Sequence, residues 1–272
     1  FYLTDARAKE WGIEKEFLKT VIKSPRECKS ILVNPKDLKY KIFICNKSKP
    51  ELKGTNALKY IEWGENASVT IKRGSGKGEA VSGFNSLETI KNRKTWYSLG
   101  EWRKAFSVLP MFERERKYCF WNQNGAMIDN ALYGVYCDKK ELNIVLNSSM
   151  FHLFKELMAR PPEGGGGGPL QIKVYHYNEM LVVHFNNLNL KIGQELFTAF
   201  IKREIKSIFE ECGIDPKLKI PIEEQEPKPL PDRAELDNIV FDALGLTADE
   251  RKDVYRAVCR LVWNRISKAK SV

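Results

Sequence analysis

Short runs of β-forming residues dominate the middle of the chain. The segment "YKIFIC" at residues 40–45 is typical of a strand. Further β-like runs follow at residues 95–99, 117–121 and 131–137, separated by turn sequences such as "NQNG". The pattern therefore predicts a β-rich, irregular region built from short strands.

Apolar residues at helical spacing predict short helices in the first quarter of the chain. Thr4 is placed to cap a helix that Gly12 ends. A second helix is predicted over residues 57–65, and Gly64 is expected to stop it.

A longer helix is predicted over residues 139–159. Asp138 and Glu141 have the spacing of a capping box at its start, and an apolar stripe runs along it. The poor helix formers at residues 147–149 predict a kink. The sequence "PPEGGGGGPL" then joins this helix to a strand predicted over residues 170–177, where apolar and polar positions alternate.

The C-terminal part is predicted to be helical. Residues 194–211 place apolar side chains on one face, and Gly213 ends that helix. Residues 214–231 are rich in Pro and Glu and predict an extended linker. A helix hairpin follows, and its expected caps and stop are Asp232 with Glu235, Gly245, and Thr247 with Glu250.

These elements together predict a mixed α/β fold of the α+β kind. An irregular, short-stranded β-sheet core is expected to have flanking helices and to be followed by the C-terminal helix hairpin. Three regions are expected: a connector over residues 1–54, a central domain over residues 55–190, and a helical region over residues 191–272.

Charge is distributed unevenly over the 272 residues. The net charge is +10, yet residues 1–120 hold 25 Lys and Arg against 14 Asp and Glu, whereas residues 121–272 hold 20 against 21. An excess of cations in one part of a chain is typical of a surface that binds a polyanion such as DNA. A basic surface that only favours solubility is the alternative.

Composition narrows the cellular setting. No run approaches the roughly 18 apolar residues of a membrane helix, and no leader sequence follows Phe1. We therefore expect a cytoplasmic protein without a membrane partner. We also expect the chain to be a fragment of a longer protein. The six cysteines are far apart and are expected to be reduced and mostly buried. With three histidines, a zinc site or His-based catalysis is not expected.

Several catalytic motifs are absent. "RGSGKGE" lacks both the upstream glycine and the Ser or Thr of a phosphate-binding P-loop. The pentaglycine follows a helix and precedes a strand, which is the reverse of a dinucleotide cradle. No Asn-Pro-Pro-aromatic tetrapeptide of an amino-methylating enzyme occurs, and "DPKLK" and "NPKDLK" fit a nuclease carboxylate set poorly. No catalytic residue is therefore predicted in this chain.

Four stretches, taken in order, resemble one protein family. They are "ALKYIEWGE", "NRKTWYSLG", "LNSSMFHLFKELMARPPEGGGGGPLQIKVY" and "DRAELDNIVFDALGLTADERKDVYRAV". They are similar to the C-terminal portion of adenine-specific DNA methyltransferases of restriction-modification systems, especially single-chain, type IIG-like enzymes. The likeness covers roughly residues 55–272; "EMLVVHF" departs from the Leu-Pro-x-Pro of many relatives.

The resemblance implies that residues 55–190 form the target recognition domain, which binds double-stranded DNA. A methylase domain of the same parent chain would precede residue 1, bind S-adenosylmethionine and methylate an extruded adenine; no cofactor is expected in the present chain. We expect the basic and aromatic middle to form a concave face for the duplex. The residues expected to contact DNA are Lys72, Arg73, Lys77, Lys91, Asn92, Arg93, Lys94, Trp96, Tyr97, Arg114, Arg116 and Asn147.

Two questions stay open at the level of sequence. The pentaglycine is compatible with a close backbone approach to DNA or the methylase domain, and equally with a plain surface loop. A different class of function is a protein-interaction module, in which the acidic residues 204–226 and the helix hairpin dock a partner subunit.

Overall fold

The computed structural model describes residues 1–71, 76–159, 168–188 and 194–268. The chain divides into two compact units: unit 1 comprises Phe1–Ile22 and Leu38–Lys104, and unit 2 comprises Lys23–Asp37 and Ala105–Val272. Residues 23–37, which the sequence analysis assigned to a connector, therefore belong to unit 2. The assignment of functions to the three expected regions stays a prediction.

In unit 1 the strands β1, β3 and β2 lie side by side in that order in a small antiparallel sheet. Thr4 Oγ1 accepts a hydrogen bond from Arg7 N and Gly12 closes the first helix in the left-handed conformation, so both predicted ends are confirmed. The elements are β1 (Tyr2–Thr4), α1 (Asp5–Trp11), η1 (Lys15–Phe17), β2 (Leu18–Ile22), β3 (Tyr40–Phe43), η4 (Pro50–Leu52), α2 (Asn56–Asn66), β4 (Ser68–Thr70), β5 (Ala80–Ser82) and η5 (Phe84–Ser86).

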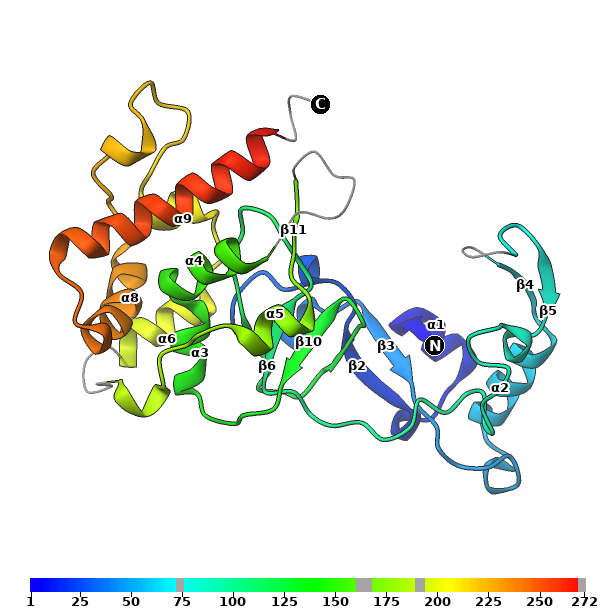
Figure 1. The fold of residues 1–272 in the computed structure, drawn as a ribbon. Helices are drawn as coiled ribbons and strands as arrows, with labels where there is room; N and C mark the ends of the chain where they lie inside the picture. The colour runs from blue at the N-terminus through cyan, green and yellow to red at the C-terminus, as the bar shows by residue number, and fades with distance from the viewer. Residues whose placement is uncertain (72–75, 160–167, 189–193, 269–272) are drawn as a thin grey trace. The chain divides into compact units, whose positions relative to one another are not determined.

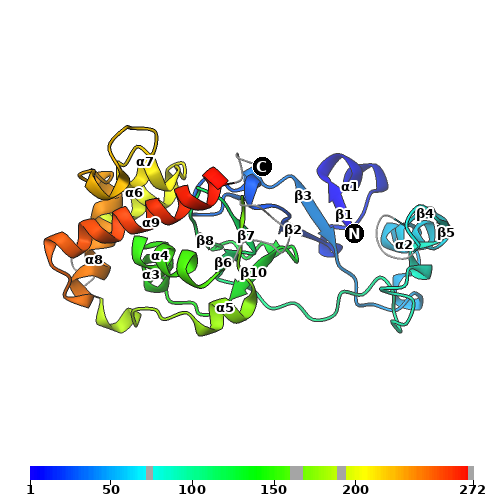
Figure 2. The same ribbon diagram turned by 45° about the horizontal axis from the view of Figure 1, so that its top comes forward.

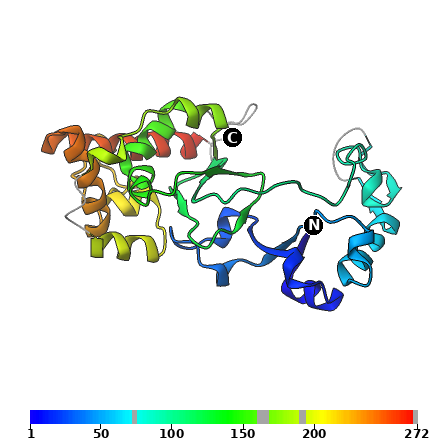
Figure 3. The same ribbon diagram turned by 90° about the horizontal axis from the view of Figure 1, so that it is seen from below.

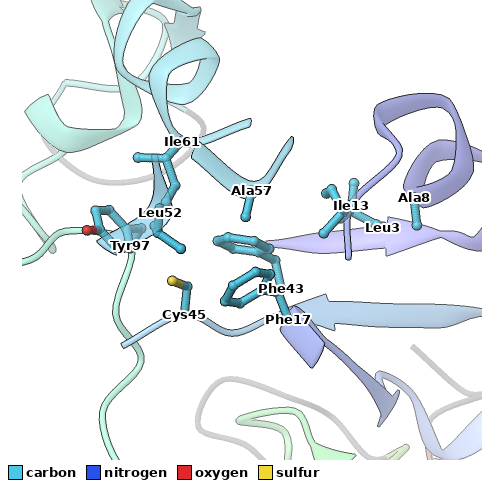
Figure 4. Close-up of a cluster of buried hydrophobic side chains, with 10 residues drawn as sticks. All are labelled: Leu3, Ala8, Ile13, Phe17, Phe43, Cys45, Leu52, Ala57, Ile61 and Tyr97. Atoms are coloured by element: carbon cyan, nitrogen blue, oxygen red, sulfur yellow. The ribbon is translucent and has the colours of Figure 1, made fainter. Parts of the chain in front are cut away.

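The core of unit 1 joins this sheet to α2. Figure 4 shows Phe17, Phe43 and Cys45 facing Leu52 and Ile61 in one buried cluster. Burial of such side chains contributes about 1.5–3 kcal/mol each before conformational entropy is subtracted. The sheet and the helix therefore hold each other in place.

Two sequence predictions for unit 1 are corrected. Residues 95–99 form turns, and no strand is assigned there. The helix does not stop near Gly64 but continues to Asn66. Gly64 serves packing instead, because a Cβ at this position would lie 2.7 Å from the ring of Trp96.

Unit 2 combines a three-stranded antiparallel sheet of order β10-β6-β8, a two-stranded pair of β7 with β11, and a group of helices. Figures 1 and 3 show most of these helices gathered on one side of the strands. The elements are η2 (Pro25–Glu27), η3 (Pro35–Asp37), β6 (Ser107–Pro110), β7 (Phe112–Glu113), β8 (Phe120–Trp121), β9 (Met127–Ile128), β10 (Leu132–Val135), α3 (Glu141–Asn147), α4 (Ser149–Met158), β11 (Leu170–Gln171), α5 (Val174–Glu179), η6 (Phe185–Asn187), α6 (Gln194–Lys202), α7 (Ile208–Cys212), η7 (Ile222–Glu224), α8 (Pro231–Leu244) and α9 (Ala248–Lys268).

The predicted helix over residues 139–159 is two helices. Ser148 has extended backbone angles and its Oγ accepts a hydrogen bond from Phe151 N, so it ends α3 and caps α4. The expected kink is thus a complete break. The capping box at Asp138 was wrong, because α3 begins only after Lys140 and has no side-chain cap.

The strand predicted over residues 170–177 is confirmed only at its start, and its second half is helix. β11 is two residues long and pairs with the equally short β7. From Lys173 the chain enters α5, where His176 Nδ1 accepts a hydrogen bond from Lys173 N at 3.2 Å. The alternation of apolar and polar residues therefore continues beyond the end of the strand.

The single helix predicted over residues 194–211 is also divided. Ile205 N donates to Lys29 O at 2.9 Å, so the backbone between α6 and α7 bonds to another segment instead of to its own helix. Ser207 and Glu210 then form a capping box that starts α7, and Gly213 ends it as predicted.

The C-terminal hairpin of α8 and α9 is confirmed, including the left-handed Gly245 and the capping box of Thr247 with Glu250. Figure 2 shows α9 running across the helical group. The cap at Asp232 was wrong, since Pro231 occupies the first turn after Leu230 and Asp232 pairs with Arg203. The predicted mixed α/β fold class is confirmed.

Two further properties concern the described residues. None of their helices is long and apolar enough to cross a membrane. All six cysteines are free, and five of them are buried, as the sequence predicted. Burial raises the pKa of the Cys28 thiol to about 12.

Candidate nucleic-acid interface

An open groove of about 690 Å³ in unit 2 is lined by three arginines from two distant segments. Arg114 and Arg116 follow β7, and Arg26 comes from η2. Guanidinium groups bind phosphate oxygens through paired N–H donors, so this combination suits a polyanion. We call this surface the arginine groove.

Arg26 was missed by the sequence analysis, which placed it in a connector. Ser24 Oγ accepts a hydrogen bond from Arg26 N, and Pro25 begins the turn that presents the side chain. The segment is held in unit 2 because Leu32 N donates to Ile201 O at 2.7 Å and Val33 N donates to Trp121 O at 3.0 Å. The Ser-Pro-Arg turn was the only local signal.

Arg116 is partly buried and is held by its neighbours. Its Nη2 donates to Cys28 O at 3.3 Å, and its guanidinium lies 5.8 Å from the centre of the Tyr118 ring. Tyr118 in turn stacks on Phe120 at 4.5 Å. The Nε of Arg116 is buried and has no hydrogen-bond partner among the described residues. This arginine is therefore held in place by its neighbours.

Arg26 and Arg114 are exposed, and unlike Arg116 their side chains are not held by neighbouring groups among the described residues. Neither side chain makes a hydrogen bond or ion pair with the residues that the structure describes. The backbone of Arg114 is nevertheless fixed, because Arg265 Nη2 donates to its carbonyl at 3.2 Å. The groove thus presents two cations that are unpaired among the described residues, and the backbone of Arg114 is anchored.

A buried ion network lies beneath the arginine groove. Glu113 is fully buried and accepts hydrogen bonds from Lys155 at 2.5 Å and Lys117 at 3.1 Å. Lys117 also pairs with Glu156, which binds Arg265 at 2.7 Å. The network joins β7 to α4 and α9, which fixes the segment that carries the groove arginines.

Arg265 extends this network to the glycine-rich loop. Its Nη1 donates to Gly168 O, and Gly168 N donates back to Arg265 O at 3.3 Å. Residues 160–167, which include the other four glycines, lie outside the described residues. The described end of the loop is therefore held against α9, and Pro169 lines the arginine groove.

The network also increases the cationic excess of the groove. Glu113 is neutralised by two lysines, which leaves Glu115 as the acidic side chain facing Arg26, Arg114 and Arg116. An excess of cations along a groove raises the local concentration of an anionic ligand and speeds its association.

Acid should unfold the protein partly through Glu156. Burial raises its pKa, but Lys117 and Arg265 outweigh burial, and the net shift lowers the pKa below its usual range. The contribution of Glu156 to the free energy of unfolding is fully present above its pKa in the unfolded chain, about 4.3. It is lost as the pH falls through its lower pKa in the folded protein. We expect Glu156→Gln, measured by urea unfolding between pH 7 and 3, to lose less stability per pH unit than the wild type. Equal slopes would contradict this.

The basic turn at residues 91–94 of unit 1 holds four of the other predicted contacts. Lys91, Asn92, Arg93 and Lys94 are all exposed. Lys91 pairs with Glu88 at 2.7 Å, and Arg93 donates to Ser98 O at 3.3 Å. Asn92 and Lys94 have no partner among the described residues, so this turn offers accessible donors. Their contact with DNA stays a prediction.

Burial changes the interpretation of two predicted contacts. Tyr97 is buried, and its hydroxyl donates to Lys47 O at 2.9 Å. Asn147 is fully buried; it accepts from Cys119 N at 2.8 Å and donates to Cys119 O at 3.0 Å. Side chains buried to this extent do not reach a DNA molecule, so both residues support the core instead.

The remaining predicted contacts have mixed positions. Trp96 is half-buried and its Nε1 donates to Glu65 Oε1 at 2.9 Å. Lys77 is exposed on the connection between β4 and β5. Lys72 and Arg73 lie outside the described residues. The accessible contacts form two groups, one in each unit, and the single concave face stays a prediction.

Comparison with known proteins finds a likeness of fold. Over 96% of its length the chain is similar to the solved structure of the type IIG restriction endonuclease BpuSI, with a TM-score of 0.54 and 15% sequence identity. The chain spans 28% of the length of that enzyme. No protein-family model matches the sequence, and no curated protein matches it. The fold is thus related to that of a restriction-modification enzyme, in line with the resemblance found in the sequence.

Proposed function

We propose that this chain binds duplex DNA as the target recognition part of an adenine-specific, S-adenosylmethionine-dependent DNA methyltransferase of a restriction-modification system. The observation that carries the proposal is the arginine groove, where Arg26, Arg114 and Arg116 lie over a neutralised ion network. The similarity of fold to a type IIG restriction endonuclease supports it.

The proposed mechanism is positioning. Arginines of the groove bind phosphates and set the register of the chain on the duplex, which carries no sequence information by itself. Asn92 and Arg93 have the amide and guanidinium groups that read adenine and guanine edges, and both are exposed. The methylase domain of the parent chain would supply cofactor binding and the transfer to an extruded adenine.

Duplex binding by the 272-residue chain tests the proposal directly. We expect the logarithm of the association constant to fall linearly with the logarithm of salt concentration, by about 0.9 per phosphate neutralised. Fluorescence anisotropy with a labelled random duplex between 50 and 200 mM salt measures this slope. Failure to bind at the lowest salt would refute the proposal.

A second candidate function is docking of a protein partner. Leu181, Val182 and Leu244 are exposed apolar side chains that line a groove of about 360 Å³ in unit 2. Exposed apolar patches are typical of interaction surfaces. The same titration separates the two functions, because a protein-docking module would show no salt-dependent affinity for duplex DNA.

A further inference from the structure

Unit 1 contains an open pocket of about 230 Å³ whose walls are aromatic. Tyr60 and Trp63 come from α2, Phe84 from η5, and Trp96 from the turn after the basic residues 91–94. Phe43 and Ile61 also line the pocket, and they belong to the core cluster shown in Figure 4. The pocket therefore rests on a packed core.

The aromatic walls are fixed in place. Tyr60 and Trp63 stack with ring centroids 5.5 Å apart and planes 21° apart, and Phe84 lies 6.0 Å from Trp63. Trp96 is oriented by its hydrogen bond to Glu65 at 2.9 Å and packs closely on Gly64. These contacts fix the positions of the rings, so the pocket exists before any ligand binds.

The size of the pocket selects a small planar ligand. Pockets for drug-sized ligands occupy roughly 300–1,000 Å³, so this one suits a single ring system. Trp63 is 39% exposed, so part of its side chain can be reached from solvent. Stacking on aromatic side chains is the general way in which proteins hold unpaired bases.

Charge near the pocket favours an anionic ligand over a cationic one. Arg7 lines it, and its ion pair with Glu10 is exposed and contributes little. Lys94 is two residues from Trp96 and has no partner among the described residues. The nearby Glu65 is already bound by Trp96 and by Lys49 at 2.6 Å. Aromatic side chains beside an arginine and a lysine match a base attached to a phosphate.

We propose that this pocket binds an unstacked nucleobase of DNA, which stacks on Trp63 and Trp96 while Arg7 and Lys94 meet the adjoining phosphates. This proposal rests on the proposed function in one respect, because duplex DNA is taken as the source of the base. The lining is mostly apolar, so stacking would discriminate little between the four bases.

The test uses three probes with the 272-residue chain: adenosine monophosphate, a duplex with one unpaired 2-aminopurine, and the same duplex fully paired. We expect the unpaired duplex to bind more tightly than the paired one and its 2-aminopurine fluorescence to be quenched. Trp63→Ala should weaken binding of the unpaired duplex by about 5- to 150-fold and leave the paired duplex unchanged.

Trp102→Ala is the matched control, because Trp102 is 41% exposed in the same unit and does not line the pocket. Trp63→Phe should keep most of the binding if stacking is responsible, and circular dichroism checks the fold of each variant. Quenching that persists in Trp63→Ala, or no preference for the unpaired base, overturns the proposal.

The outcomes also distinguish the two proposals. If the paired duplex binds with a salt slope but the unpaired base adds nothing, duplex binding stands and the pocket proposal fails. If neither duplex binds, saturable binding of adenosine monophosphate that Trp63→Ala abolishes supports the pocket alone. Absence of that binding as well overturns both.

Discussion

Replacing Glu113 with glutamine should lower the free energy of unfolding by about 3–5 kcal/mol, the usual cost of breaking one partner out of a buried ion pair. Glu113 is the carboxylate that faces Lys155, and both side chains are fully buried. Burial already lowers the pKa of Lys155, and Glu113 only partly offsets this. Without the carboxylate, a buried ammonium group would lack its partner.

Glu115→Gln is the control, since it makes the same change two residues away. Glu115 is only partly buried and makes no ion pair with the described residues. Urea unfolding at pH 7 measures both variants. The double variant Glu113→Gln with Lys155→Met should recover much of the loss, because it removes the uncompensated charge. A Glu113→Gln protein as stable as wild type would show that the network does not support the groove.

Replacing Arg26 and Arg114 together with glutamine should weaken duplex binding about 100-fold at 50 mM salt. Each lost phosphate contact removes about 0.9 from the salt slope, so the slope should become shallower by about 1.8. Both side chains are exposed and make no ion pair with the described residues, so stability should change little. Anisotropy titrations at four salt concentrations provide the slope.

The matched control is Lys252→Gln with Arg260→Gln. These cations lie on α9, where they pair with Glu226 and Glu223 on the surface. The control removes the same charge from the chain as a whole, so it separates net charge from local contact. If both double variants lose affinity equally, the arginine groove is not the duplex-binding surface.

The correct and incorrect element predictions differ in the range of the interactions involved. Thr4, Gly12, Thr247 and Gly245 were assigned correctly because a cap or a left-handed turn depends on a few adjacent residues. The helix over residues 194–211 was wrong because the backbone at Ile205 bonds to Lys29, far away in the chain. Nothing local in its sequence indicates such a partner.

The candidate site shows the same limit. The exposed basic turn at residues 91–94 was found from composition, since clustered cations in a turn remain at the surface. Arg26 was missed because its contribution depends on the packing of residues 23–37 into unit 2. Asn147 was misassigned because an amide looks alike in sequence whether it faces DNA or satisfies the backbone of Cys119.

By itself, the sequence determined the mixed fold class, the caps and stops of several helices, the C-terminal hairpin and the basic character of the first 120 residues. These properties follow from short-range backbone preferences and from charge, which the order of residues specifies directly. Tertiary structure alone decided which cations share a groove, which charges are buried beneath it and which aromatic rings enclose a pocket. Those outcomes depend on contacts between residues far apart in the chain, and only the folded state brings them together.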